Sequence, residues 1–264
     1  MNPHQPSIQE AFDRHASVYD ERFSSAVLGE RIRSDFWQIA DRAFASSRVI
    51  LDLGAGTGED AIHFAGNGIQ VTAVDVSPGM IARLQSKAMA KGVSGRVRCV
   101  TGAMNEYLPD NLRFDGIVSN FGAINCLPDL TWLRATCNVA LAPRSPVVLT
   151  TMGWLYPLET AVHLLKGQPG HAFRRLKHPC EVKIEGVAVR VYYHSLNQMR
   201  RMLGPQFRLE RVEGLRAFLP VPGWEHLEPS IFQRALGPID RFWCRWSVTA
   251  TLADHFVSVW RYQP

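Results

Sequence analysis

The 264-residue sequence lacks the features that place a protein in a membrane or outside the cell. No apolar run approaches the roughly 20 residues that a membrane-spanning helix needs. The N-terminal stretch MNPHQPSIQEAFDRH has no apolar core of the kind found in secretory signals. The five cysteines are scattered without a C-x-x-C pair, so neither a disulfide framework nor a metal site is expected. A cytoplasmic location is the simplest expectation.

Positive charge is unevenly distributed along the chain. Residues 1–150 carry 14 Lys and Arg against 15 Asp and Glu, whereas residues 151–264 carry 15 against 9. The surplus in the second half is either a solvated basic face or a surface that attracts an acidic substrate, an anionic membrane or RNA. Charge alone leaves these alternatives open.

Short apolar runs alternate with helical patterns from residue 48 onward. Strands are expected at 48–53, 69–75, 96–101, 114–120 and 145–152, and helices at 58–66, 78–91 and 129–141. Alternating strands and helices, with strands that are apolar almost throughout, predict an α/β protein whose parallel sheet is covered by helices on both faces.

The pattern divides the chain into four predicted parts. They are an N-terminal helical lid at 1–46, a core of alternating strands and helices at 47–153, a cap insertion after strand five at 154–195, and the rest of the sheet at 196–264 with a helical insertion at about 219–247. A strand pair turning at Glu185-Gly186 is expected inside the cap.

A glycine-rich turn follows the first strand in VILDLGAGTG, and two carboxylates accompany it. Glycines allow a tight turn and a close approach of ligand to backbone. Asp52 ends the strand, where it would repel a pyrophosphate and attract an ammonium group. Asp75 ends the next strand, where a carboxylate accepts hydrogen bonds from ribose hydroxyls. S-adenosylmethionine meets these requirements; the alternative is a dinucleotide fold with a degenerate turn.

Residues 49–130 resemble the cofactor half of the class I S-adenosylmethionine-dependent methyltransferases. VILDLGAGTG resembles the first motif of that family, VTAVDVSPGM the second, and FDGIVSNFGAINCLPDL the segment around the fourth strand. AFDRHASVYD is similar to the N-terminal helix of bacterial small-molecule members. The resemblance implies a Rossmann-like sheet of seven strands, mostly parallel with an antiparallel last strand.

The resemblance also implies which residues bind the cofactor. The methionine moiety would be held by Tyr19, Asp52, Gly54, Ala55 and Gly56. The ribose would be bound by Asp75, the adenine flanked by Val76, Met80, Ala103 and Met104, and the reactive centre lined by Asn120. The family's acidic contact to the adenine amino group is missing from TGAMNEY, where Asn105 or Glu106 would have to replace it.

Three residues of the second half are candidates for a general base that deprotonates the methyl acceptor. Glu159 and His163 are spaced i, i+4, which suits either a base with its orienting carboxylate or a surface pair. His194 ends a predicted strand, where it is either a base or the neighbour of a helix cap.

The two insertions are rich in aromatic side chains, which favours enclosure of an apolar ligand. These residues are Trp154, Tyr156, Phe173, Tyr192, Tyr193, Trp224, Phe232, Phe242, Trp243 and Trp246. The expected function is O- or N-methylation of a small, largely apolar acceptor by a monomer or homodimer. The alternatives are methylation of tRNA, a protein or a carrier-linked acid, and a non-catalytic cofactor-binding module. Peripheral membrane contact also stays open, whereas a nucleic-acid partner is less favoured.

Overall fold

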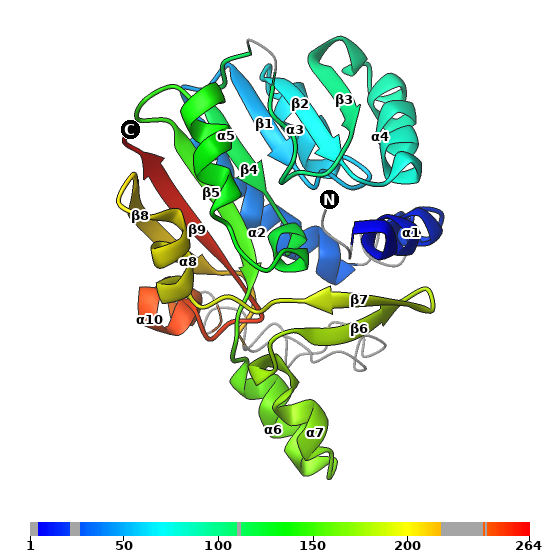
Figure 1. Cartoon of the computed structure of the whole chain (residues 1–264), viewed down its shortest axis with the longest axis vertical. Helices are drawn as coiled ribbons and strands as arrows, with labels where there is room; N and C mark the ends of the chain where they lie inside the picture. The colour runs from blue at the N-terminus through cyan, green and yellow to red at the C-terminus, as the bar shows by residue number, and fades with distance from the viewer. Residues whose placement is uncertain (1–4, 22–26, 110–111, 218–239, 241) are drawn as a thin grey trace.

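The computed structural model describes residues 5–21, 27–109, 112–217, 240 and 242–264. Its sheet has seven strands in the order β3-β2-β1-β4-β5-β9-β8 (Figure 1). The strands are β1 (Val49–Leu53), β2 (Gln70–Asp75), β3 (Val97–Thr101), β4 (Gly116–Ser119), β5 (Pro146–Met152), β8 (Phe207–Gly214) and β9 (His255–Tyr262). The first five pair in parallel, and β9 is antiparallel to both β5 and β8. The predicted fold class is confirmed.

Helices cover both faces of the sheet and enclose a separate apolar core on each. One core joins β1 and β2 to α2 (Val27–Ala43), α3 (Glu59–Gly66) and α4 (Pro78–Ala90). The other joins β4, β5 and β9 to α5 (Trp132–Ala140) and α8 (Leu196–Leu203). Two short 3-10 turns, η2 (Ser94–Arg96) and η3 (Ala123–Cys126), complete this part. Burial on both faces explains why these strands read as continuous apolar runs.

Local capping rules fix the starts of two helices. Ser77 caps α4, because its Oγ accepts the amide of Met80 at 3.0 Å, and Pro78 follows at the first helical position. Ser195 and Gln198 form a reciprocal capping box at the start of α8. His194 therefore directly precedes a capped helix, as one of its two interpretations predicted.

Helix α1 (Gln5–His15) bridges the core and the cap. It packs against α4 and against both strands of the hairpin β6 (Cys180–Ile184) and β7 (Val187–Val191). Asp13 Oδ1 accepts the amide of Gly79 at 2.9 Å, and His15 Nδ1 lies 3.0 Å from Glu185 Oε1. The N-terminal helix is thus tied to the start of α4 on one side and to the hairpin turn on the other.

The segment after β5 forms the cap. It consists of α6 (Pro157–Leu165), α7 (Pro169–Ala172), η4 (Arg174–Leu176) and the β6–β7 hairpin, and Figure 1 shows α6 and α7 projecting away from the sheet. The hairpin turns at Glu185 and Gly186, whose φ angles are 45° and 81°. Two successive positive φ angles match the turn type that suits the twist of a two-residue hairpin. The predicted strand pair and its turn are confirmed.

Most of the helical insertion expected at about 219–247 lies outside the described residues, as do Trp224 and Phe232. The described part resumes fully at Phe242 and contains α10 (Ser247–Ala250), which leads into β9. Strand β8 ends at Gly214. None of the described helices is long and apolar enough to cross a membrane.

Candidate functional site

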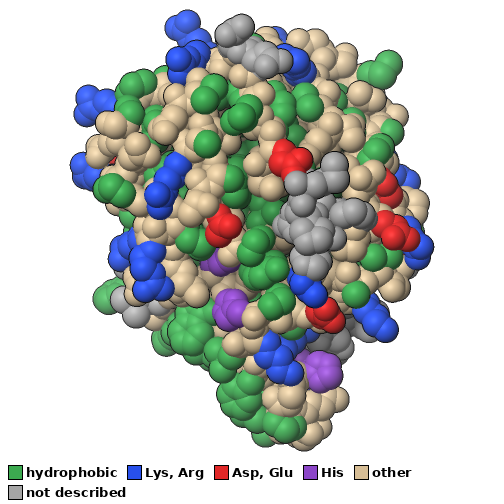
Figure 2. Space-filling view, in the orientation of Figure 1, with side chains coloured by type: hydrophobic (Ala, Val, Ile, Leu, Met, Phe, Trp, Pro, Cys, Tyr) green, Lys and Arg blue, Asp and Glu red, His purple; other side chains and the backbone are tan. Residues whose placement is uncertain are grey.

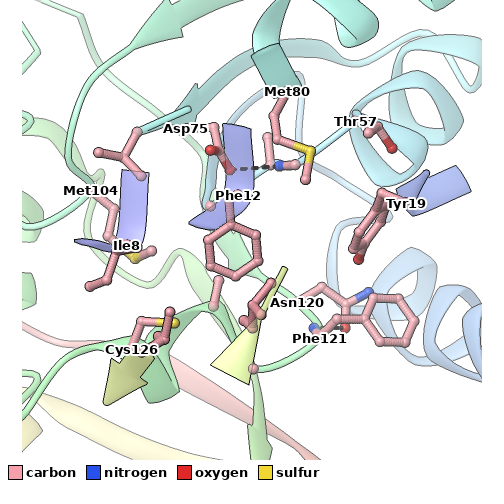
Figure 3. A pocket seen from close by; sticks show the side chains of 18 of the residues that line it. Ile8, Phe12, Tyr19, Thr57, Asp75, Met80, Met104, Asn120, Phe121 and Cys126 are labelled. Atoms are coloured by element: carbon pink, nitrogen blue, oxygen red, sulfur yellow. Dashed lines mark hydrogen bonds between the residues drawn. The ribbon is translucent and has the colours of Figure 1, made fainter. Parts of the chain in front are cut away.

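A cavity of about 380 Å³ lies at the carboxyl ends of β1, β2 and β4, under α1 and the β6–β7 hairpin. Ligands of open α/β sheets bind at this end, and the volume falls within the range of small-molecule sites. Figure 3 shows the ring of Phe12 projecting into the middle of the cavity, between Asp75 and Cys126. One half of the cavity is polar and faces the glycine turn, and the other half is apolar and faces the cap.

The glycine turn forms one wall of the polar half. Gly54, Gly56 and Gly58 all have positive φ, at 77°, 54° and 84°. A Cβ on Gly54 would lie 2.4 Å from Cβ of Ala123, so only glycine fits between the turn and η3. A Cβ on Gly56 would meet no atom within 4 Å, because it would point into open space. The turn therefore holds the space next to Gly56 free for a ligand.

Asp75 stands at the end of β2 beside this turn. Its Oδ2 accepts the amide of Gly56 at 2.8 Å (Figure 3), and its Oδ1 accepts the amide of Ser77 at 2.9 Å. Burial raises the pKa of this carboxyl group, and the two backbone hydrogen bonds oppose the rise. Each oxygen has a second lone pair, so a fixed carboxylate lines the cavity with capacity for two further donors.

Asp52 lies behind the turn with 1% of its surface exposed. Its Oδ2 is buried and has no hydrogen-bond partner among the described residues. Burial raises the pKa of Asp52 well above its usual range, and the carboxylates of Asp60 and Asp75 raise it further. A buried carboxylate oxygen without a hydrogen-bond partner is costly, and Arg33 is the nearby cation that opposes the rise of this pKa.

The sequence reasoning missed an arginine and an aspartate that belong to the same polar half. Asp60, in the first turn of α3, accepts from Trp37 Nε1 at 2.8 Å, Asn120 Nδ2 at 2.8 Å and Arg33 at 3.3 Å. Arg33 comes from α2, is 5% exposed, and has a buried Nε without a described partner. The orphaned atoms of Asp52 and Arg33 are an acceptor and a donor that belong to groups of opposite charge.

A second set of contacts holds the segment that follows α1 over the polar half of the cavity. Thr57 Oγ1 donates to Asp20 Oδ1 at 2.6 Å, and Lys87 Nζ bonds the same carboxylate at 3.1 Å. Lys87 also pairs with Glu59 at 2.6 Å. Tyr19, next to this cluster, lines the cavity, and burial raises its pKa to about 12, so its hydroxyl stays protonated.

The other half of the cavity is apolar. It is lined by Ile8, Phe12, Cys126, Met152, Val182, Ile184, Val189 and Val191. Its polar side chains are Arg174 and Tyr193, both from the cap. Burial raises the pKa of Cys126 to about 12, so its thiol stays neutral and behaves as a small apolar group. Inward-facing alternate residues of both hairpin strands supply half of these apolar residues.

The predicted cofactor-binding residues are brought together by the fold. All of them line the cavity except Asp52, which lies behind the turn, and Ala103, which is next to the lining residue Met104. Asn105 and Glu106, the candidates for the adenine amino group, are not among the lining residues. Tyr193 was among the aromatic residues expected to enclose an apolar ligand, whereas the cap residues Val182 and Val189 were not identified from the sequence, although their strand alternation was readable.

The three candidate bases do not line the cavity. His163 Nδ1 lies 3.0 Å from Gln168 Oε1 and its ring stacks on His171, so it does not pair with Glu159. His194 is 4% exposed and bonds the carbonyl of Leu127 at 3.1 Å through Nε2. Burial lowers its pKa. The i, i+4 spacing of Glu159 and His163 was read correctly, but both side chains turn to other partners.

Glu159 instead belongs to a buried ion-pair network that fixes the cap. It accepts from Arg174 and, at 2.5 Å, from Arg175. Arg175 also pairs with Asp254 at 2.5 Å, and Asp254 pairs with Arg216. Burial alone would raise the pKa of Asp254, but Arg216, His255 and Arg175 hold it well below its usual range.

The guanidinium of Arg175 lies over two aromatic rings as well. Its Cζ is 5.3 Å from the ring centre of Tyr156 and 5.2 Å from that of Tyr193. Tyr193 lines the cavity, so the network positions one wall of the apolar half. The arrangement joins the cap to the start of β9, far along the sequence.

Comparisons with known proteins agree with this geometry. A family model described as a methyltransferase domain matches residues 50–143. The demethylmenaquinone methyltransferase of Mycolicibacterium gilvum is 29% identical over 65% of this chain and 72% of its own length. The tRNA 5-carboxymethoxyuridine methyltransferase of Escherichia coli is 33% identical, over 34% of this chain and 36% of its own length.

Solved structures give the same fold along the whole chain. The Burkholderia thailandensis 1,6-didemethyltoxoflavin-N1-methyltransferase, solved with bound 1,6-didemethyltoxoflavin and S-adenosylhomocysteine, is similar with a TM-score of 0.59. The alignment covers 100% of this chain and 92% of that one at 18% identity, which supports the fold alone. The matched methyltransferase domain, the curated relatives and the shared fold support a class I S-adenosylmethionine-dependent methyltransferase.

Proposed function

We propose that this methyltransferase acts on a small, largely apolar acceptor and methylates an oxygen or nitrogen atom. The observation that carries the proposal is the apolar half of the cavity, which is enclosed by α1, η3 and the cap and adjoins the polar half directly. An enclosed apolar wall suits a compact aromatic or aliphatic body. The demethylmenaquinone and toxoflavin enzymes, named above for such acceptors, support the same class.

The polar half has the groups that S-adenosylmethionine requires. Asp75 would accept the ribose hydroxyls, and the space beside Gly56 would admit the ligand close to the backbone. Asp52 would stabilise the ammonium group and Arg33 the carboxylate of the methionine moiety, since each has an orphaned buried atom. Val76, Met80 and Met104 would pack on the adenine. The bound cofactor supplies an electrophilic methyl group.

We infer that catalysis depends on alignment of the acceptor with the methyl group and on exclusion of water, rather than on a histidine base. None of the described residues that line the cavity is histidine, and the thiol of Cys126 stays neutral at physiological pH. Burial raises the pKa of Tyr193 too, although Arg175 opposes that rise. The chain would hold the nucleophile in line with the methyl group inside a dry cavity. A His194→Ala variant should accordingly keep turnover within a few-fold of the unmodified protein.

Labelled methyl transfer to fractionated cell extract tests the acceptor class. We expect label from S-adenosylmethionine in the fraction extracted by organic solvent, and Val189→Phe to abolish it by filling the apolar half. Ala188→Phe is the matched control, because residue 188 is exposed and lies on the opposite face of β7. Both variants should still bind S-adenosylhomocysteine. Label in tRNA or protein would refute the proposal, and absence of label from every fraction would favour a binding module.

Asp52→Asn should separate stability from cofactor binding. The pKa of Asp52 is higher in the folded chain than in the unfolded one, so stability falls as pH rises from about 4 through the raised pKa. A neutral amide removes this penalty, and the cofactor-free variant should melt at a higher temperature at pH 7.5. The cationic cofactor favours the carboxylate, so its binding to the unmodified chain should tighten over the same pH rise.

Calorimetric titration with S-adenosylmethionine from pH 5.5 to 8, beside thermal melts, measures both effects. The variant should bind more weakly than the unmodified chain at pH 7.5, and its affinity should lose most of the pH dependence. Equal affinities at pH 7.5, or the same pH dependence in both proteins, would exclude Asp52 from the ammonium site.

A further inference from the structure

A second, open cavity of about 970 Å³ adjoins the first on the outer side of the cap. It lies between α7, η4 and the β6–β7 hairpin, with Arg174, Lys177, Lys183 and Arg190 among its lining residues. Both cavities share Arg174 and Val182. The groove therefore begins where the apolar half of the methyltransferase site ends.

The groove has a strong excess of positive charge. It is lined by four Arg and Lys side chains and by one carboxylate, Glu181, which lies 3.6 Å from Arg190. Glu181, Lys183 and Arg190 share the outer face of the hairpin, because Glu181 pairs with Arg190 across the strands and Lys183 is two residues from Glu181. The apolar residues of the same strands face the first cavity. The hairpin is thus amphipathic, with a separate ligand surface on each side.

Arg174 is built into the junction between the two cavities. One end of its guanidinium pairs with Glu159, which Arg175 also holds, so the side chain is anchored from behind. Its Nε is buried and has no hydrogen-bond partner among the described residues. The side chain as a whole is 31% exposed and lines both cavities, so part of the guanidinium is open to a ligand, and carboxylate or phosphate oxygens are the groups that it binds best.

We propose that the methyl acceptor carries a carboxylate or phosphate group, which Arg174 binds at the junction and the groove residues Lys177, Lys183 and Arg190 attract. The apolar body with its nucleophile would then lie in the first cavity and the anionic group at the mouth of the groove. The inference rests on the proposed function, because it assumes a small acceptor in the apolar half. The inference adds that the end of the acceptor away from the nucleophile carries an anionic group.

A polynucleotide fits the same surface less well. Nucleic acids need broad contact with many phosphates. The projecting segment 157–176 beside the groove instead carries exposed apolar side chains (Figure 2). Leu165, Phe173 and Leu176 have 88%, 45% and 47% of their surfaces exposed. A single anionic group next to apolar surface matches an amphipathic small molecule better than a charged backbone.

Two fluorescent probes that differ in one group test the proposal. They are 6-(2-naphthyloxy)hexyl phosphate and 6-(2-naphthyloxy)hexanol, titrated into protein saturated with S-adenosylhomocysteine at low salt. The phosphate should bind at least about tenfold more tightly, as charge-assisted hydrogen bonds imply. Arg174→Gln should reduce that advantage to within about twofold, and the affinity for the neutral probe, measured on the same variant, corrects for any change in the apolar half that affects both probes alike.

Charge reversal gives a test that leaves Arg174 in place. The double variant Lys183→Glu with Arg190→Glu should lose most of the advantage of the phosphate probe. Lys91→Glu with Arg96→Glu is the matched control, since both residues are exposed and neither lines the groove or the first cavity. The control should keep the advantage in full.

The outcomes separate this inference from the proposed function. Equal binding of the two probes, or an unchanged advantage in Arg174→Gln, would overturn the anionic subsite alone. Failure of both probes to bind a protein that still binds S-adenosylhomocysteine would overturn the apolar acceptor site and the subsite with it. Displacement of the phosphate probe by tRNA at micromolar concentration, with steep salt dependence, would overturn the small-molecule assignment of the groove.

Discussion

Gly56→Ala should weaken the affinity for S-adenosylhomocysteine by about 10- to 100-fold, which corresponds to the 1–3 kcal/mol of overpacking. The added Cβ meets no protein atom within 4 Å, so it occupies only space that we assign to the cofactor. Its positive φ of 54° adds a backbone cost of about 1–2 kcal/mol in both the free and the bound protein. Calorimetric titration measures the affinity, and thermal melting measures the backbone cost.

Gly68→Ala is a closely matched control. Gly68 also has a positive φ, 91°, and a Cβ there would also meet nothing within 4 Å, but it lies in the turn before β2 at the opposite end of the sheet. Both variants should lose similar stability, and only Gly56→Ala should lose cofactor affinity. Equal loss of affinity in the two variants would mean that backbone strain, and not occupied ligand space, explains the effect.

Asp75→Ala should weaken cofactor binding by about 1–3 kcal/mol, because it removes charge-assisted hydrogen bonds to the ribose. The substitution also removes the acceptor of the Gly56 and Ser77 amides, so it should lower the stability of the free protein. Titration with S-adenosylhomocysteine and denaturant unfolding of the free variant give the two quantities separately.

Asp115→Ala is the control for the backbone hydrogen bonds that Asp75→Ala removes. Asp115 Oδ2 accepts the amides of Arg48 and Val49 at 2.8 and 3.1 Å, at the amino end of β1. It therefore makes the same number of backbone hydrogen bonds as Asp75 without lining the cavity. The control should lose stability and keep its affinity. If Asp75→Ala kept its affinity for S-adenosylhomocysteine, Asp75 would not be the group that binds the ribose.

The order of secondary structure was readable from the sequence because local rules and tertiary demands agree in the core. Strands β1, β4 and β5 are buried on both faces, and their apolar runs are therefore almost unbroken. Gly54 and Asp75 were identifiable because a tight turn and a strand-end carboxylate leave a fixed spacing. The expected turn at Glu185-Gly186 followed from the same short-range chemistry.

Long-range partners were not readable in this way. Glu159 and His163 do lie one turn apart on α6. Glu159 is nevertheless buried and paired with Arg174 and Arg175, and helical spacing does not predict such pairs. Arg33 and Asp60 come from different helices and meet only when α2 packs beside α3. Their side chains are polar at positions that face the core, and that departure from the apolar pattern was the available signal.

A crystal structure with S-adenosylhomocysteine tests the central claim most directly. We expect the ribose on Asp75, the methionine moiety between Asp52 and Arg33, and the sulfur facing the apolar half lined by Cys126 and Val189. A ribose bound elsewhere, or a sulfur that faces bulk solvent or a shallow basic surface, would contradict it.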